Sequence, residues 1–235
     1  MKTVSQRTSD YVRKRLEHEL SGHDWHHVER VWKTAAYLQS KEGGNLKVIE
    51  LAVLLHSAAE RDYKAGTDEK VRPLALSGII DVLDIEEEFK PLIISIIQLC
   101  KFRGSETEKP YSLEGKIVQD ANWLDSLGAI GIARNFTAGG YIGRKIYDPD
   151  IKPKEDLDPL SFIRSKKERT SVAYFYEKAF LIPDMLNTKT AREIAVKRTA
   201  YVKDFIKRFL EEWYLQDITE GLSEPLDIAV PAELQ

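Results

Sequence analysis

The sequence has almost no cysteine and no long apolar run, and these two absences exclude several classes of protein. Cys100 is the single cysteine among 235 residues, which excludes an intramolecular disulfide framework and any metal site built from several cysteines. No run of about 18 apolar residues occurs, and the first 20 residues lack the apolar centre of a signal peptide. We therefore expect a cytoplasmic protein that does not enter the membrane.

The charge is nearly balanced, and this balance disfavours polyanionic partners. Lys and Arg together number 35 and Asp and Glu number 38, which gives a net charge of -3 at pH 7. Such a balance gives no reason to expect binding to nucleic acid or to a membrane. A small-molecule partner that is anionic would need a local basic pocket. The sequence does not indicate an oligomeric state.

Apolar residues recur at helical spacing along nearly the whole chain, and no series of short alternating strands is present. The sequence therefore predicts an all-α helical array. Asp24 and Gly43-Gly44 are typical start and stop signals, and Thr190 with Glu193 has the spacing of a capping box. The predicted helices lie near residues 6–20, 24–42, 46–60, 68–83, 89–97, 113–124, 161–181 and 190–213.

Glycine and proline gather between residues 136 and 160, which predicts a long loop there. The chain after residue 219 is acidic and contains two prolines, as is typical of a poorly ordered tail. No repeat, low-complexity tract or linker divides the rest. We expect a single helical domain over residues 1–218 and an acidic tail over residues 219–235.

All five histidines lie between residues 18 and 56, and two of them fall on apolar helix faces. His27 shares a face with Val31 and Ala35, and His56 follows the apolar run LAVLL. Either histidine taken alone is most simply a core residue with a polar partner. Two such histidines on successive helices favour a site, and we expect them to face a common cavity.

Three segments carry a resemblance to a known family: HDWHHVERV at 23–31, LAVLLHSAAE at 51–60 and EGKIVQDANWLDSLGAIGIAR at 114–134. They resemble the motifs of the HD superfamily of metal-dependent phosphohydrolases, in particular the bacterial HD-domain hydrolases thought to act on nucleotides. Further matching segments are FTAGGYIGRKIYDP, YFYEKAF and MLNTKTAREIAVKR. The resemblance implies a helical array that hydrolyses a nucleotide or another phosphate ester with Mn²⁺ or Mg²⁺.

The same resemblance implies four metal ligands, and this sequence departs from two of them. It retains His27 and His56, but Ser57 and Asn122 stand where the family pattern has aspartate. Asp120 is the remaining candidate for a third ligand, with Asp125 beside it in the same segment. A hydroxyl or an amide supplies neither the charge nor the affinity of a carboxylate for Mn²⁺ or Mg²⁺. We therefore expect weak or absent metal binding at His27, His56 and Asp120.

Other departures fall in the same motif regions. Trp123 replaces a residue that is basic in the family, and Ala173 and Tyr174 replace an Asn-His pair. Departures concentrated around one pocket indicate an altered site rather than random drift. Natural degeneration and deliberate redesign both produce such a pattern.

Several polar residues near these motifs are candidates for the chemistry. Glu60 follows His56 by four residues and is either a general acid or base or a solvated helix end. Lys101 and Arg103 suit phosphate oxygens, although they also suit a polar helix end. Cys100 is either a buried inert thiol or a nucleophile.

His23 and Asn122 complete the predicted substrate-binding set, beside Lys101 and Arg103. His23 lies four residues before His27 and so shares its helix face.

Three functions fit these features. The first is a phosphohydrolase whose metal site is impaired or replaced, so that catalysis itself is uncertain. The second is a metal-free catalyst in which Ser57 reaches His27 across the helix pair, since adjacent residues such as Ser57 and His56 do not share a helix face. The third is a nucleotide-binding protein without turnover.

Overall fold

The computed structural model describes residues 2–61, 72–155, 158, 161–162 and 167–219, and every regular element within them is a helix. The all-α prediction is therefore confirmed. None of the described helices is both long enough and apolar enough to cross a membrane.

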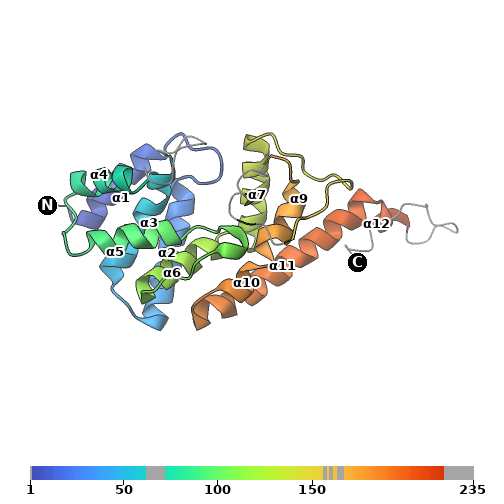
Figure 1. Ribbon diagram of the computed structural model, residues 1–235. Helices are drawn as coiled ribbons and strands as arrows, with labels where there is room; N and C mark the ends of the chain where they lie inside the picture. Colours follow the sequence, from blue (N-terminus) through green and yellow to red (C-terminus); the bar gives the residue numbers. More distant parts are fainter. Residues whose placement is uncertain (1, 62–71, 156–157, 159–160, 163–166, 220–235) are drawn as a thin grey trace.

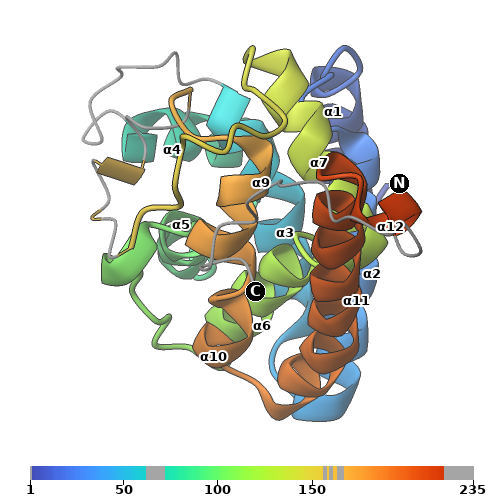
Figure 2. The same ribbon diagram turned by 90° about the vertical axis from the view of Figure 1, so that its right-hand side faces the viewer.

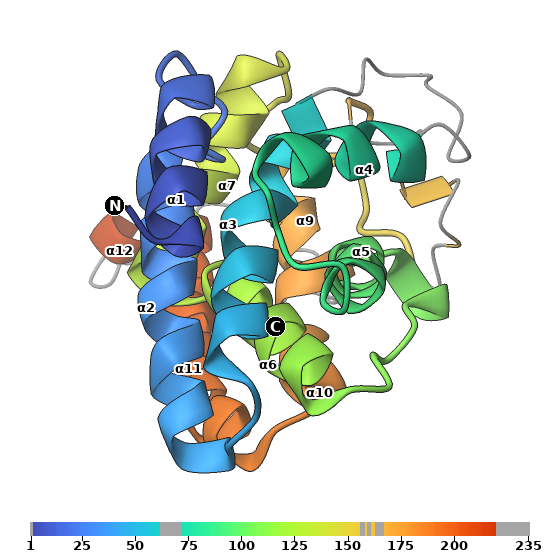
Figure 3. The same ribbon diagram turned by 90° about the vertical axis from the view of Figure 1, so that its left-hand side faces the viewer.

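The first part of the chain forms six helices around α3. Their bounds are α1 (Val4–Arg15), α2 (Trp25–Glu42), α3 (Leu46–Arg61), α4 (Arg72–Val82), α5 (Lys90–Leu99) and α6 (Leu113–Leu124). Residues 51–55 of α3 are completely buried, because this helix contacts α1, α2, α5 and α6. Figure 3 shows α2 and α3 side by side, with α6 beside the lower part of α3. A helix that is apolar on all sides belongs at such a central place.

The second part of the chain packs along one long helix, α11 (Lys189–Trp213). Figure 1 shows α11 running diagonally along the lower right of the molecule, below α7 and α9, and Figure 2 shows it upright beside α9. It contacts α2, α6 and α7, so it joins the two parts of the structure. The other elements are a short 3₁₀ helix η1 (Gly104–Glu106), α7 (Gly128–Tyr141), α9 (Ser171–Tyr174), a π-helix η2 (Phe175–Ala179), α10 (Ile182–Met185) and α12 (Gln216–Thr219).

The boundary signals in the first part are confirmed for two helices. The Asp24 side chain accepts a hydrogen bond from the backbone N–H of His27 at 2.8 Å, and α2 ends before Gly43. Ser112 caps α6 in the same way. The first helix is shorter than predicted and ends at Arg15, and its capping box, Thr3 with Gln6, was not expected from the sequence.

The prediction of a loop from residue 136 is wrong at its start, because α7 continues to Tyr141. Gly139 and Gly140 lie inside this helix, near its end. A Cβ atom on Gly139 would lie 2.3 Å from the Ser171 hydroxyl, so glycine at this position permits close packing between α7 and α9. The chain is irregular from Ile142 to Glu155.

The predicted continuous helix over 161–181 is also wrong. Thr170 caps a new helix, α9, by accepting a hydrogen bond from Ala173 N–H, and the backbone then widens into the π-helix η2. The long helix α11 begins at Lys189, one residue before the predicted start, because Thr188 rather than Thr190 is its cap.

Other predictions fall outside the described residues. The first residues of the helix predicted over 68–83 precede the described part that resumes at residue 72, and the predicted tail lies almost entirely beyond residue 219. The division into one domain over 1–218 and a tail stays a prediction.

Candidate functional site

His27 lies on the buried side of α2 and faces α6. Its side chain is 1% exposed, and its Nδ1 lies 2.7 Å from the Asp125 carboxylate. A carboxylate only accepts hydrogen bonds, so Nδ1 carries the proton. The other ring nitrogen, Nε2, is therefore a bare acceptor in the neutral imidazole.

Asp125 is held by two guanidinium groups as well as by His27. Arg30 donates from Nε to Oδ1 at 2.9 Å and from its terminal nitrogen to Oδ2 at 3.1 Å. Arg134 donates to the Asp125 backbone carbonyl and lies 3.1 Å from its carboxylate. This fork-shaped pairing fixes the carboxylate, and through it the orientation of the His27 ring.

His56 lies on α3 and meets His27 across the interface between the two helices. Its Nδ1 contacts the Val53 carbonyl oxygen one turn earlier, so this nitrogen also carries the proton. The two Nε2 atoms lie 3.2 Å apart, and the ring centroids 5.3 Å apart. The expected common placement of His27 and His56 is thus present in the structure. Two acceptor nitrogens that face each other call for a shared cation, which is either a metal ion or a proton.

Ser57 contacts His56 and not His27, contrary to the expectation from helix geometry. Its Oγ lies 3.0 Å from His56 Nε2. The His56 ring bends back along α3 toward Val53, and this brings Nε2 over the next residue. Ser57, His56, His27 and Asp125 therefore form one continuous chain of polar contacts.

The surroundings of His27 favour its neutral form. Burial lowers the pKa of His27 well below its usual value, and the charges of Arg134 and Arg30 and the nearby histidines lower it further. The same arginines disfavour a metal cation. Asp125 carries one negative charge, and Arg30 and Arg134 carry two positive charges. No negative charge of Asp125 is therefore left to offset the charge of a divalent ion.

Asp120 has a different environment from the histidine pair. Its two oxygens accept hydrogen bonds from the backbone and side chain of Asn187 and from the backbone and hydroxyl of Thr188, at 2.7–2.9 Å. Burial raises the pKa of Asp120, and these donors act against that shift. The structure thus offers a structural role for Asp120, at the start of α11, in place of the ligand role that the resemblance suggested.

Two other predicted residues meet at the end of α5. The Cys100 thiol is buried and donates to the Ile97 carbonyl. The Cys100 carbonyl accepts from Trp123 Nε1 at 3.0 Å and from the Asn122 amide at 3.3 Å.

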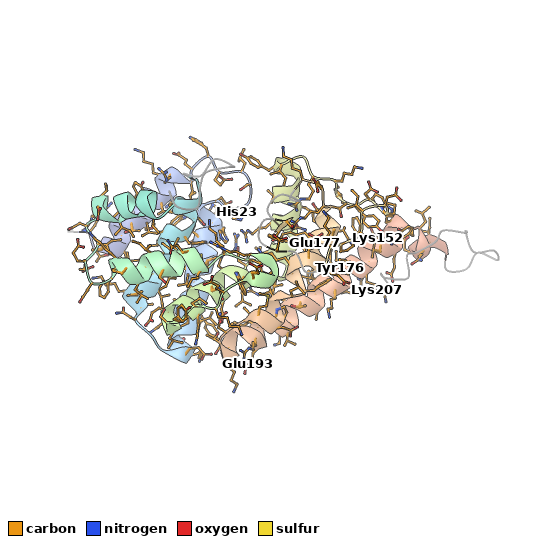
Figure 4. The ribbon with its side chains drawn as sticks, viewed as in Figure 1. His23, Lys152, Tyr176, Glu177, Glu193 and Lys207 are labelled. Atoms are coloured by element: carbon orange, nitrogen blue, oxygen red, sulfur yellow. The ribbon has the colours of Figure 1, made fainter. Side chains whose placement is uncertain are left out.

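The remaining predicted residues lie at different distances from the pair. The His23 ring lies 5.6 Å from the His27 ring and its Nδ1 lies 3.2 Å from the Ser21 hydroxyl; Figure 4 shows His23 in the upper middle of the molecule. Lys101 and Arg103 are half-buried just beyond α5. Glu60 lies on α3, but its side chain is outside the described part of the structure.

The arginines that hold Asp125 were not predicted. Arg30 follows His27 by three residues and so shares its helix face, which is a signal that the sequence does contain. Arg134 comes from α7, and only the tertiary structure brings it to α6.

The separation of the His27 and His56 Nε2 atoms can be compared with the geometry of a metal site. Two nitrogen ligands about 2.0 to 2.1 Å from one ion lie about 2.9 to 3.4 Å apart at ordinary coordination angles. The 3.2 Å between the Nε2 atoms fits this range. However, no group of three or more His, Cys, Asp or Glu side chains suited to a metal occurs among the described residues. The structure therefore provides a partial ligand set, made of two imidazoles and the nearby Ser57 hydroxyl.

Comparisons with known proteins agree with this fold and these motifs. The family model described as HD domain matches residues 24–127, which include both histidines. An uncharacterised protein of Bacillus subtilis, YpgQ, is 36% identical over 203 residues, which cover 84% of this chain and 88% of that protein.

Solved structures give the same result over nearly the whole chain. A Lactobacillus plantarum protein is 33% identical with a TM-score of 0.80, over 91% of this chain and 98% of that one. An HD-superfamily hydrolase of Bacillus thuringiensis is 38% identical with a TM-score of 0.65, over 89% and 96%. YpgQ in complex with ADP is 31% identical with a TM-score of 0.63, over 87% and 96%. This chain belongs to the HD superfamily and has the scaffold of its hydrolases.

Proposed function

We propose that this chain is an HD-type phosphohydrolase with an impaired metal site, which binds a divalent ion weakly and turns over a nucleotide or another phosphate ester slowly. The observation that carries the proposal is the pair of Nε2 atoms, 3.2 Å apart, whose rings are each fixed by a hydrogen bond on the opposite nitrogen. Such outer partners are typical of metal-binding histidines.

The residues of the chain have separate tasks in this site. His27 and His56 would hold the ion through Nε2, Asp125 keeps His27 in the correct tautomer, and the Val53 carbonyl does the same for His56. When bound, a divalent ion supplies an activated water and polarises a phosphoryl oxygen. Nitrogen donors without carboxylates favour Zn²⁺ or Ni²⁺ over Mn²⁺ and Mg²⁺.

The choice of a nucleotide as substrate class is supported by a relative. YpgQ has been crystallised in complex with ADP, and it is similar to this chain over most of the length of both. The same relative also supports the alternative of nucleotide binding without turnover, and the rate of hydrolysis separates the two.

Metal analysis and titration test the proposal. Protein purified without chelator should carry far less than one equivalent of transition metal, and it should bind Zn²⁺ at least about tenfold more tightly than Mn²⁺ in calorimetry. His27→Ala should abolish this binding and the slow hydrolysis of nucleotides. His26→Ala is the matched control, because His26 is the adjacent residue and its side chain is 72% exposed. Tight binding of a full equivalent of Mn²⁺, or hydrolysis that survives His27→Ala, would contradict the proposal.

A second candidate function follows from the contact between Ser57 Oγ and His56 Nε2 at 3.0 Å. In a metal-free reaction, Ser57 would attack the carbonyl carbon of an activated ester, and its proton would pass to His56 Nε2. The resulting imidazolium faces His27, which is held by Asp125. The alcohol of the ester would leave with that proton, and water would then release the acyl group.

This second function has its own test with chelator present. Ser57→Ala and His56→Ala should each lower the hydrolysis of an activated ester by about 10²- to 10⁴-fold, and Cys100→Ala should leave it unchanged. Ser40→Ala is the control, because the Ser40 hydroxyl is bonded to the Tyr37 carbonyl on the exposed side of α2. Equal rates in all the variants would exclude the metal-free hydrolase.

A further inference from the structure

Tyr174, at the end of α9, is surrounded by cationic side chains. The Arg144 guanidinium lies 5.7 Å from the centre of its ring, and the Lys178 ammonium lies 5.5 Å from it. Arg134 contributes a third positive charge that acts on the phenol. Tyr174 and Lys178 are four residues apart in the chain, on either side of the junction between α9 and η2.

Arg134 has the Asp125 carboxylate 3.1 Å away, and Arg144 donates to the Asn135 side-chain oxygen at 3.3 Å; the phenol over which Lys178 and Arg144 lie carries no charge when it is neutral. Burial raises the pKa of Tyr174, but Lys178, Arg134 and Arg144 together bring it below its usual value. Their combined field therefore favours negative charge at this place. Either the phenolate or a bound anion would satisfy it, and the bound anion leaves the phenol protonated as a hydrogen-bond donor.

The cationic cluster adjoins the histidine pair. Arg134 donates to the backbone carbonyl of Asp125, which holds His27, and its charge acts on both His27 and Tyr174. An anion beside Tyr174 would therefore lie on the side of the pair that faces α7.

The local backbone also marks this segment. Lys178 lies within the π-helix η2, and such widened turns occur frequently at functional sites. Nearby, Glu177 pairs with Arg169 at 3.0 Å, and both side chains are 1% exposed. Figure 4 shows Glu177 near the middle of the molecule. The Arg169 charge thus has a carboxylate partner of its own, while Lys178 extends over the rings of Tyr174 and Phe102.

We propose that Tyr174, Lys178 and Arg144 form a binding site for a phosphate dianion beside the histidine pair. The guanidinium offers a planar fork to phosphate oxygens, the ammonium a compact charge, and the phenol a neutral donor. This proposal rests on the proposed function, which supplies the identity of the rest of the substrate. In a site with a complete metal centre the ion would help to bind the phosphate group, and here these side chains would hold it.

Calorimetry with inorganic phosphate, in the presence of chelator and at constant ionic strength, tests this site. Lys178→Met and Arg144→Met should each weaken phosphate binding by about tenfold or more, because each removes a charge-assisted hydrogen bond. Lys178→Arg should retain affinity within about threefold, and Tyr174→Phe should lose about threefold or more. Lys203→Met is the matched control, because Lys203 lies 5.8 Å from the Phe180 ring on the exposed side of α11, and it should leave binding unchanged.

The outcomes separate this site from the metal site. Phosphate binding that none of the three substitutions weakens, or that Lys203→Met weakens equally, would overturn the proposal, as would the absence of measurable phosphate binding by the parent protein. Thermal unfolding of each variant shows whether it is folded, and Arg144→Met and Lys178→Met test the site independently. A Zn²⁺ titration without phosphate reports on His27 and His56 alone, so failure at Tyr174 does not imply failure there.

Discussion

Replacing Ser57 and Asn122 together by aspartate is expected to raise the affinity for Mn²⁺ by at least about 10³-fold. Loss of even an outer partner of a metal ligand costs about 10- to 100-fold in affinity. Two such losses at the lower value amount to about 10²-fold, and two carboxylates that contact the ion directly should contribute more than that. They would also offset the positive charges of Arg30 and Arg134 beside Asp125. Calorimetry of the double variant against the parent measures the gain.

The double variant should also show a stability that depends on metal. Asn122 donates its amide to the Cys100 carbonyl at 3.3 Å, and an aspartate there would place a carboxylate near a carbonyl oxygen. Without Mn²⁺ the variant should therefore unfold at a lower temperature than the parent, and Mn²⁺ should reverse the loss by mass action. Ser57→Asn is the neutral control. An unchanged Mn²⁺ affinity in the double variant would show that positions 57 and 122 are not ligand positions.

Asp120→Ala is expected to lower the free energy of unfolding by about 3 to 5 kcal/mol, because it leaves buried donors without an acceptor. The Asp120 carboxylate accepts four hydrogen bonds from Asn187 and Thr188, at the start of α11. Urea denaturation at constant pH measures the change. The affinity for Zn²⁺ of the folded variant should stay unchanged.

Glu42→Ala provides the comparison for Asp120. Glu42 accepts hydrogen bonds from Thr190 at the same end of α11, from its backbone N–H at 2.8 Å and from its side chain, and it is partly exposed. Its removal should cost about 1 kcal/mol or less. If Asp120→Ala is no more destabilising than Glu42→Ala and abolishes Zn²⁺ binding, Asp120 is a ligand and not a structural residue.

Local signals in the sequence predict the first part of the fold well. Asp24, Gly43 and Ser112 act within a few residues of their own position, and α3 is uniformly apolar because it is surrounded by other helices. The glycine pair in α7 could not be interpreted in this way. Gly139 responds to Ser171, a residue on another helix, and only the packed structure shows this contact.

The histidine pair was predictable, but its partners were not. The placement of His27 and His56 on apolar faces is a property of each helix, whereas Asp125 is 98 residues away from His27 in sequence. Two aspartates close together in one segment therefore have different surroundings, one at the histidines and one at α11. The contact between Ser57 and His56 depends on how the His56 ring turns, which the sequence does not specify.

The hydrogen bonds that orient His27 and His56 have an evolutionary consequence. Arg30 and Arg134 hold Asp125, which orients His27, and the Val53 carbonyl orients His56, so protein contacts orient the two rings without the help of an ion. Substitutions at ligand positions then change activity without unfolding the chain, and natural selection for stability does not remove them. Descendants of a metal hydrolase with such a pocket can lose ligands one at a time, remain folded, and acquire a different chemistry in the same place.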